Sequence, residues 1–153
     1  MKYSSELKLR LFEKCEEYIN SKIANSKAAL DSLKSTGEGD IKSSSGDKFE
    51  TEIAMRHLEL EKFGKQLTQA LNLKKVMPLL RPEKVLSKIG LGSLVITSNG
   101  NFYISISAGK IEIDGASYFA LSGATPVAKL MEGKIAGEAF SLNGKTVTII
   151  EVY

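Results

Sequence analysis

Residues 35–52 read STGEGDIKSSSGDKFETE, a polar stretch that contains three glycines. It separates two long segments with helical periodicity, so we predict that it forms the bend of a helical hairpin. The stretch holds five acidic and two basic residues, which gives it a net charge of −3. Residues 1–34 have seven bases and five acids, and residues 53–76 have five bases and two acids. Acids are common in turns and at helix starts, so the charge alone does not indicate a function.

The two segments that flank the bend have the spacing of paired helices. Residues 5–34 contain neither proline nor glycine, and a helix of this length needs a partner. Its apolar stripe consists of Phe12, Ile19, Ile23, Leu30 and Leu33. The stripe of residues 47–75 has coiled-coil spacing and consists of Phe49, Ile53, Leu60, Phe63, Leu67 and Ala70. We therefore predict an antiparallel coiled-coil hairpin over residues 1–76, with an acidic tip at residues 35–52.

The pattern changes after residue 76. Residues 77–86 contain two of the three prolines and are typical of a linker. From residue 87 onward, short β-rich runs alternate with Asn-Gly and Asp-Gly turns, and only residues 126–131 are predicted to be helical. We therefore predict that residues 87–153 form a small antiparallel sheet with one short helix, so that the whole chain belongs to the α+β class.

Composition excludes several kinds of site. The chain has 153 residues and a net charge of +3, which is too small to indicate nucleic-acid binding by itself. Its single cysteine, Cys15, and single histidine, His57, are interpreted as helix-face residues without a chemical role. The sequence shows no cluster of zinc ligands, no phosphate-binding loop, no signal peptide and no apolar run of membrane-spanning length. We expect a cytoplasmic protein with no membrane contact and no cofactor of its own.

Residues 122–153 read SGATPVAKLMEGKIAGEAFSLNGKTVTIIEVY and resemble the C-terminal domain of the bacterial Gre transcript-cleavage factors. The match opens at residues 125–129, continues through Gly133-Lys134 and Gly137-Glu138, and closes at residues 150–152. The resemblance implies an FKBP-like fold, that of the FK506-binding proteins, which serves for docking on RNA polymerase without prolyl isomerase activity. By the same resemblance, the partner-binding residues are Pro126, Lys129, Gly133 and Lys134.

The bend resembles the acidic tip of the same family. Residues 39–45 match the start of the tip motif, and residues 48–50 resemble its end. Asp40 falls on the family's tip aspartate, whereas Ser43 stands where the family has a glutamate. In Gre factors the coiled coil enters the secondary channel of RNA polymerase. There the tip carboxylates help to hold the second magnesium ion, at which backtracked RNA is cleaved.

The resemblance implies that Asp40 assists catalysis through a Mg²⁺ ion shared with the polymerase active site. Magnesium prefers several carboxylate oxygens, and Glu38 or Asp47 would supply a second one if the loop folds suitably, whereas the neutral Ser43 would not. We predict a monomeric accessory factor, not itself an enzyme, that binds RNA polymerase and contacts RNA only indirectly. It would modulate elongation with weak or absent stimulation of cleavage. The alternative is a non-enzymatic coiled-coil interaction module that presents the acidic tip to another basic partner.

Overall fold

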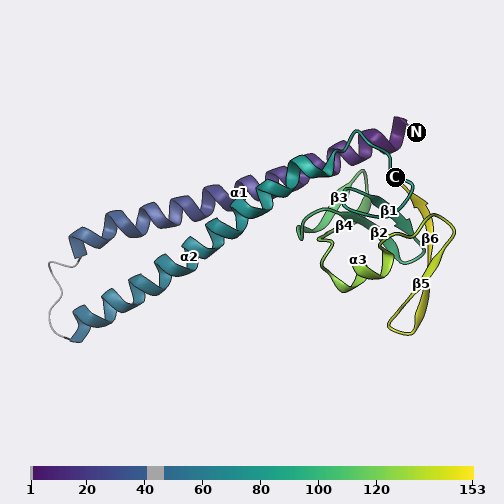
Figure 1. Ribbon diagram of the computed structural model, residues 1–153. Coiled ribbons are helices and arrows are strands. Elements are labelled where there is room, and N and C mark those ends of the chain that lie inside the picture. Colours follow the sequence, from purple (N-terminus) through teal and green to yellow (C-terminus); the bar gives the residue numbers. More distant parts are fainter. Residues whose placement is uncertain (1, 41–46) are drawn as a thin grey trace. The chain divides into compact units, whose positions relative to one another are not determined.

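The computed structural model describes the backbone of residues 2–40 and 47–153 and the side chains of residues 5–35 and 48–153 (Figure 1). The helices are α1 (Lys2–Asp40), α2 (Asp47–Leu80) and α3 (Pro126–Met131). The strands are β1 (Leu94–Thr97), β2 (Gly100–Ile104), β3 (Gly109–Ile113), β4 (Ala116–Leu121), β5 (Ala139–Leu142) and β6 (Lys145–Val152). The predicted α+β class is confirmed. The chain divides into two compact units, one of Met1–Tyr18 with Lys75–Tyr153 and one of Ile19–Lys74.

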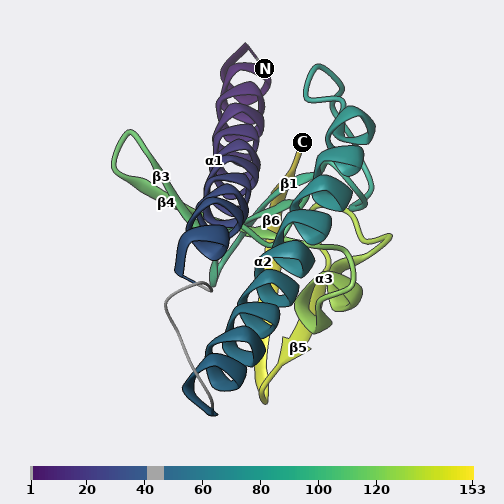
Figure 2. The same cartoon turned by 90° about the vertical axis from the view of Figure 1, so that its left-hand side faces the viewer.

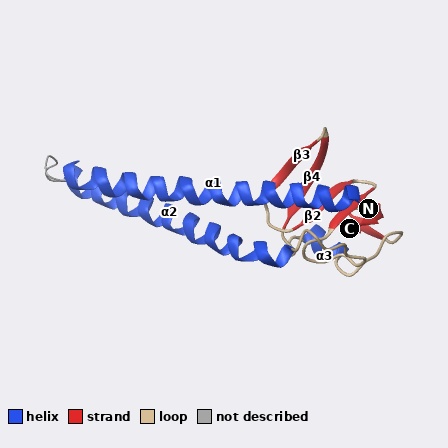
Figure 3. Cartoon of the chain, turned by 90° about the horizontal axis from the view of Figure 1, so that it is seen from above, coloured by secondary structure: helices blue, strands red, loops and turns tan. Residues whose placement is uncertain are grey.

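The unit Ile19–Lys74 is a helical hairpin, in which α1 and α2 lie alongside each other in opposite directions (Figure 3). Within this unit, the predicted stripe positions are the less exposed ones on both helices, from Ile19 on α1 to Ala70 on α2. On the opposite side of α2, Met55 and Leu58 are 59% and 67% exposed. Two helices can bury only the stripe that faces the partner, so most of these side chains are half-buried rather than fully buried.

Both helices are longer than the sequence patterns predict. α1 continues to Asp40, so the first part of the predicted bend is helical despite Gly37 and Gly39. Glycine weakens a helix by only about 1 kcal/mol per residue, which an established helix tolerates. α2 continues to Leu80 and includes Pro78, so the boundary predicted after residue 76 lies inside this helix. Met77 and Leu80 are buried, and their burial stabilises the last turn against the proline.

The other unit, Met1–Tyr18 with Lys75–Tyr153, contains a six-stranded sheet and is called the sheet unit below. The order of its strands is β3-β4-β2-β1-β6-β5. The hairpin pairs β1–β2, β3–β4 and β5–β6 are antiparallel, as the Asn-Gly and Asp-Gly turns predict. β2 and β4 pair in parallel, with Phe102 opposite Phe119, so the sheet is antiparallel except at this pair. The parallel pair arises because the chain leaves β2, forms the edge strand β3, and then turns back as β4. Strand β4 lies between β3 and β2, so it runs in the same direction as β2.

Both faces of the sheet are covered. On one face, α3 buries Ala128 and Met131 in a core cluster that also contains Val95, Phe102 and Ile149. On the other face, Leu94 and Tyr103 are also 0% exposed, although they alternate with Val95 and Phe102 along their strands. The N-terminal part of α1 covers this second face, and Leu7, Leu11 and Cys15 are buried there. The α3 helix begins at a Thr125 cap, whose side chain accepts the Ala128 N–H.

Ile149 and Ile150 are neighbours on β6 and provide a matched test of this core. Ile149 is 0% exposed in the α3 cluster, whereas Ile150 is 53% exposed. We expect Ile149→Ala to lower the free energy of unfolding by about 2–5 kcal/mol, because it removes buried methylenes and leaves a cavity. Ile150→Ala is expected to change it by less than about 0.5 kcal/mol. Urea unfolding monitored by circular dichroism measures both. A larger effect of Ile150→Ala would show that β6 has the opposite face buried, and equal effects would contradict the difference in burial between the two residues.

Candidate functional site

The acidic bend predicted to be the functional tip lies where α1 ends and α2 begins. The backbone positions of Glu38 and Asp40 fall in the last turn of α1, and Asp47 is the first residue of α2. The side chains of Glu38, Asp40 and Asp47, and the whole of Ser43, lie outside the described residues. The helix ends therefore locate three of the four predicted tip residues along the backbone.

Helix electrostatics separates these acids into two groups. The N-terminal end of a helix carries partial positive charge, so Asp47 and Glu50 suit the start of α2. The C-terminal end carries partial negative charge, and the last turn of α1 contains no basic residue. Glu38 and Asp40 are therefore placed where carboxylates lower helix stability. Helix stability accounts for Asp47 and Glu50 but gives no reason for Glu38 and Asp40.

Along the backbone, position 38 lies two residues before position 40 in the last turn of α1, and Asp47 begins α2. The side chains of these acids lie outside the described residues, so the choice of Glu38 or Asp47 as the second carboxylate beside Asp40 stays a prediction.

The predicted partner-binding residues lie close together around α3. Pro126 is the first residue of this helix, and Lys129 stands in its last turn; both are exposed. Gly133 has a φ of 77° and donates its N–H to the carbonyl of Ile89 over 2.8 Å. Ile89 in turn donates its N–H to the carbonyl of Lys134 over 2.9 Å. Gly133 and Lys134 thus have a structural role in fixing the turn after α3, which the sequence analysis did not assign.

Two apolar residues of this region were missed at the sequence level. Leu130 and Ile135 are 41% and 44% exposed, and they neighbour the two lysines in sequence. We define the α3 surface as Pro126, Lys129, Leu130, Lys134 and Ile135. Leu130 lies on α3 but is not one of its buried residues, and this apolar position of a short amphipathic helix was the signal that could have revealed it. Ile135 lies after the end of α3, where no local pattern indicates its exposure. Exposed apolar side chains beside basic ones suit an apolar partner surface with acidic residues.

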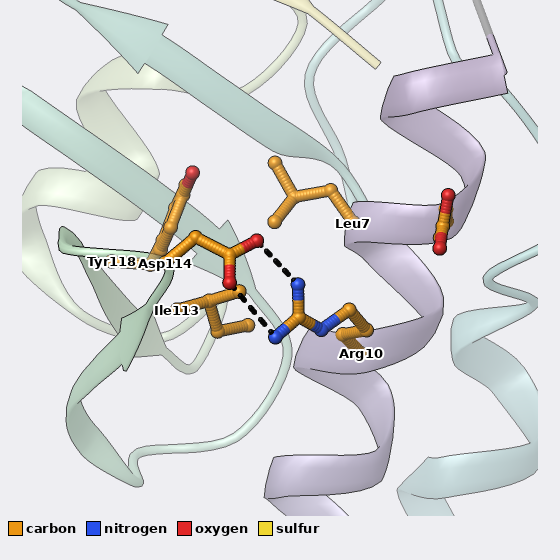
Figure 4. A pocket seen from close by; sticks show the side chains of 6 residues that line it. Leu7, Arg10, Ile113, Asp114 and Tyr118 are labelled. Carbon is orange, nitrogen blue, oxygen red and sulfur yellow. Dashed lines mark hydrogen bonds and ion pairs between the residues drawn. The ribbon is translucent and has the colours of Figure 1, made fainter.

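A small pocket of about 90 Å³ lies between the N-terminal part of α1 and the β3–β4 turn (Figure 4). Arg10 donates to Asp114 in an ion pair of 2.6 Å. This hydrogen bond lowers the pKa of the Asp114 carboxyl and raises the pKa of Arg10. Asp114 and Gly115 both have positive φ, as a two-residue hairpin turn requires. The pair holds the turn on α1, and neither group is shifted toward neutrality, as acid–base chemistry at neutral pH would need.

The cysteine does not have the environment of a reactive thiol. Cys15 is 0% exposed, and burial raises its pKa despite a 3.7 Å contact with the Ser105 hydroxyl. Reactive thiols have a lowered pKa and access to solvent. His57 is exposed on α2. In the part of the chain that the structure describes, no three residues among histidine, cysteine, aspartate and glutamate are grouped as a metal site would require.

Lys8 is a charged residue inside the sheet unit. Its side chain is 0% exposed, and its Nζ donates to the carbonyl oxygen of Lys84 over 2.6 Å. Burial lowers the pKa of Lys8 to about 8, although the carboxylate of Glu83 opposes this shift. The ammonium is therefore less favourable in the folded protein than in the unfolded chain.

This burial predicts a pH dependence of stability. The unfolded chain binds the Lys8 proton more tightly, so between the folded pKa of about 8 and the ordinary value of 10.5 stability should rise with pH. Lys8→Met removes the buried charge and should stabilise the protein below pH 8, by an amount on the order of 1–3 kcal/mol that diminishes toward pH 10.5. Urea unfolding at a series of pH values checks this, with Lys14→Met on the exposed side of α1 as the control. Stability differences between wild type and Lys8→Met that stay constant with pH would contradict it.

Comparisons with known proteins give little further guidance. No protein-family model matches the chain, and no curated protein matches it. A solved structure, that of the GreA factor homolog 1 (Gfh1) protein of Thermus thermophilus, aligns with 98% of this chain and 94% of its own at 15% identity, with a TM-score of 0.33. A likeness of this strength carries no argument about function. Among the described residues, none of the helices combines the length and the apolar character that a membrane span needs.

Proposed function

We propose that this chain is a Gre-like transcription factor that binds RNA polymerase and inserts the acidic end of its helical hairpin into the secondary channel. In this role it is an accessory factor that modulates elongation, and any RNA cleavage is performed by the polymerase. The observation that carries the proposal is the hairpin itself. Two helices of 39 and 34 residues meet at a bend where Glu38 and Asp40 occupy positions that helix stability disfavours.

The resemblance of residues 122–153 to Gre C-terminal domains supports the same proposal. Two of its matched positions, Pro126 and Lys129, are exposed on the α3 surface, so both are available to a partner. Leu130 and Ile135 add exposed apolar area beside them. A protein that docks through this surface and through the hairpin bend binds more tightly than through either one, because the second contact is intramolecular.

The tip chemistry follows from the carboxylates. A Mg²⁺ ion shared with the polymerase would activate water and stabilise the charge that develops during phosphodiester hydrolysis. Asp40 would supply carboxylate oxygens to that ion, and Glu38 or Asp47 would supply a second carboxylate if the loop folds suitably. Ser43 offers no carboxylate at the position where the family has one. We therefore propose that binding to polymerase is retained and that stimulation of cleavage is weak.

The docking surface can be tested with two charge reversals. We expect the double substitution Lys129→Glu with Lys134→Glu to weaken binding to purified core RNA polymerase by at least about tenfold, which is about 1.4 kcal/mol. Lys145→Glu, a charge reversal at an exposed position of the β5–β6 hairpin, should leave binding unchanged and serves as the control. Biolayer interferometry with immobilised polymerase gives the affinities. Absence of binding by the wild-type chain would reject the polymerase proposal and favour another basic partner for the acidic bend.

The tip is tested by RNA cleavage in stalled, backtracked complexes over a Mg²⁺ titration. We expect weak cleavage with the wild-type chain, none with Asp40→Ala, and stronger cleavage with Ser43→Glu, because a second carboxylate holds the ion more tightly. If Asp47 or Glu38 already supplies the second carboxylate, Ser43→Glu would add little, and Asp47→Ala or Glu38→Ala would be as damaging as Asp40→Ala. All four variants should keep their affinity for polymerase. Strong cleavage that does not depend on Asp40 would show that the tip chemistry is wrong.

A further inference from the structure

The strand β3 forms one edge of the sheet, and among the described residues its outer side has no partner strand (Figure 2). On its inner side, all five residues pair with β4, from Gly109 opposite Ala120 to Ile113 opposite Ala116. An edge strand presents a row of backbone N–H and C=O groups that another strand can pair with. β3 contains no proline, and its residues after Gly109, which has a φ of 78°, are able to pair with another strand.

The side chains of β3 alternate sharply between the two faces of the sheet. Ile111 and Ile113 are 8% and 4% exposed and point into the unit. Lys110 and Glu112 point to the other face, with side chains 55% and 68% exposed, and form an ion pair of 3.3 Å along the strand. Their neighbours on β4 are Phe119 and Ser117, so the adjacent strand provides no charge opposite either residue.

We propose that β3 pairs antiparallel with β3 of a second copy of this chain, about a twofold axis at Ile111. This proposal replaces the monomer predicted from the sequence with a dimer. In this register, Lys110 of each copy lies directly opposite Glu112 of the other. Two cross-strand ion pairs then form on the exposed face, and the two Ile111 side chains meet on the buried face. The pairing is isologous, as a twofold interface requires, because one short strand supplies both members of each ion pair.

The order of charges along β3 selects this register over its alternatives. When the twofold axis is perpendicular to the sheet, residues that face each other lie on the same face of the sheet. A register centred on Lys110 places the two lysines opposite each other, and one centred on Glu112 does the same with the two glutamates. Both arrangements bring like charges together, which destabilises a strand pair. Only the register centred on Ile111 brings opposite charges together at both positions.

The length of β3 sets the strength of this association. Five residues bury much less area than the interface of a permanent dimer, so the dimer should be weak and should depend on protein concentration. Charged side chains on an edge strand also protect against unspecific pairing. A copy of β3 places opposite charges beside Lys110 and Glu112, whereas a strand with another charge pattern places like charges there.

Sedimentation equilibrium of the full chain over a concentration series tests the proposal. We expect the wild type to dimerise with a dissociation constant between about 10 μM and 1 mM. Lys110→Glu and Glu112→Lys each place like charges opposite each other at both positions, and each should weaken the dimer by at least about tenfold. The double variant with both substitutions restores opposite charges and should dimerise as the wild type does. Lys129→Glu, on the α3 surface, is the matched control and should not change the dimer.

A mixture of the two single variants gives the sharpest result. Each variant alone is expected to be monomeric, but the strands of Lys110→Glu and Glu112→Lys are complementary to each other and should form a heterodimer. This heterodimer should weaken in 1 M salt, where the screening length falls to about 3 Å. A wild-type chain that stays monomeric up to about 1 mM, or single variants that dimerise as the wild type does, would overturn the proposal. Circular dichroism of each variant verifies that it is folded.

Discussion

The sheet unit depends on a single constraint, which is that both faces of its sheet must be removed from water. Leu94 and Val95 are consecutive residues on β1, point to opposite faces and are both 0% exposed. The short helix α3 covers only one of these faces. The other face requires a second apolar layer, and the N-terminal part of α1 provides it with Leu7, Leu11 and Cys15. A segment at the start of the chain is thereby built into the domain formed by its end.

Covering the second face with a helix also brings polar groups out of water. Lys8 enters with its ammonium group bonded to a backbone carbonyl, and the Tyr103 hydroxyl is buried without a hydrogen-bond partner among the described residues. Burial raises the pKa of the Tyr103 hydroxyl above its ordinary value. Each of these groups weakens the packing that the apolar residues provide, since a buried polar group loses its hydration. The ion pair of Arg10 with Asp114 lies at the exposed margin of the same layer, where it holds the turn at little desolvation cost.

The hairpin unit is stabilised in a different way. Its two helices bury one stripe each, and at Ser26 and Ala70 small residues face an open groove of about 360 Å³ lined mainly by polar side chains. Its stability therefore comes from repeated shallow contacts and from helix propensity, without a deep core. In a structure of this kind, acids at the end of α1 lower local stability without disturbing a core. This separation lets the bend carry carboxylates that helix electrostatics disfavours.

The sequence by itself determined the elements and the turns of this protein. The stripes from Ile19 to Ala70, the Asp114-Gly115 and Asn143-Gly144 turns and the helix that begins at Pro126 are local patterns, and the structure confirms each as predicted. Their information lies within a few residues, at periods of 3.6 and 2 that helices and strands impose. The acidic candidates at the bend were also found from sequence, through a family resemblance rather than through geometry.

Only the tertiary structure decided how these elements combine. The parallel pairing of β2 with β4, the layer that α1 adds to the sheet, and the contact of Arg10 with Asp114, 104 positions away, are all long-range features. No local period encodes them, because they result from which apolar faces can be buried together once the chain has folded. The exposure of Ile135 is also a tertiary feature: in sequence this residue is indistinguishable from a core residue, and only the packing of the folded chain leaves it at the surface.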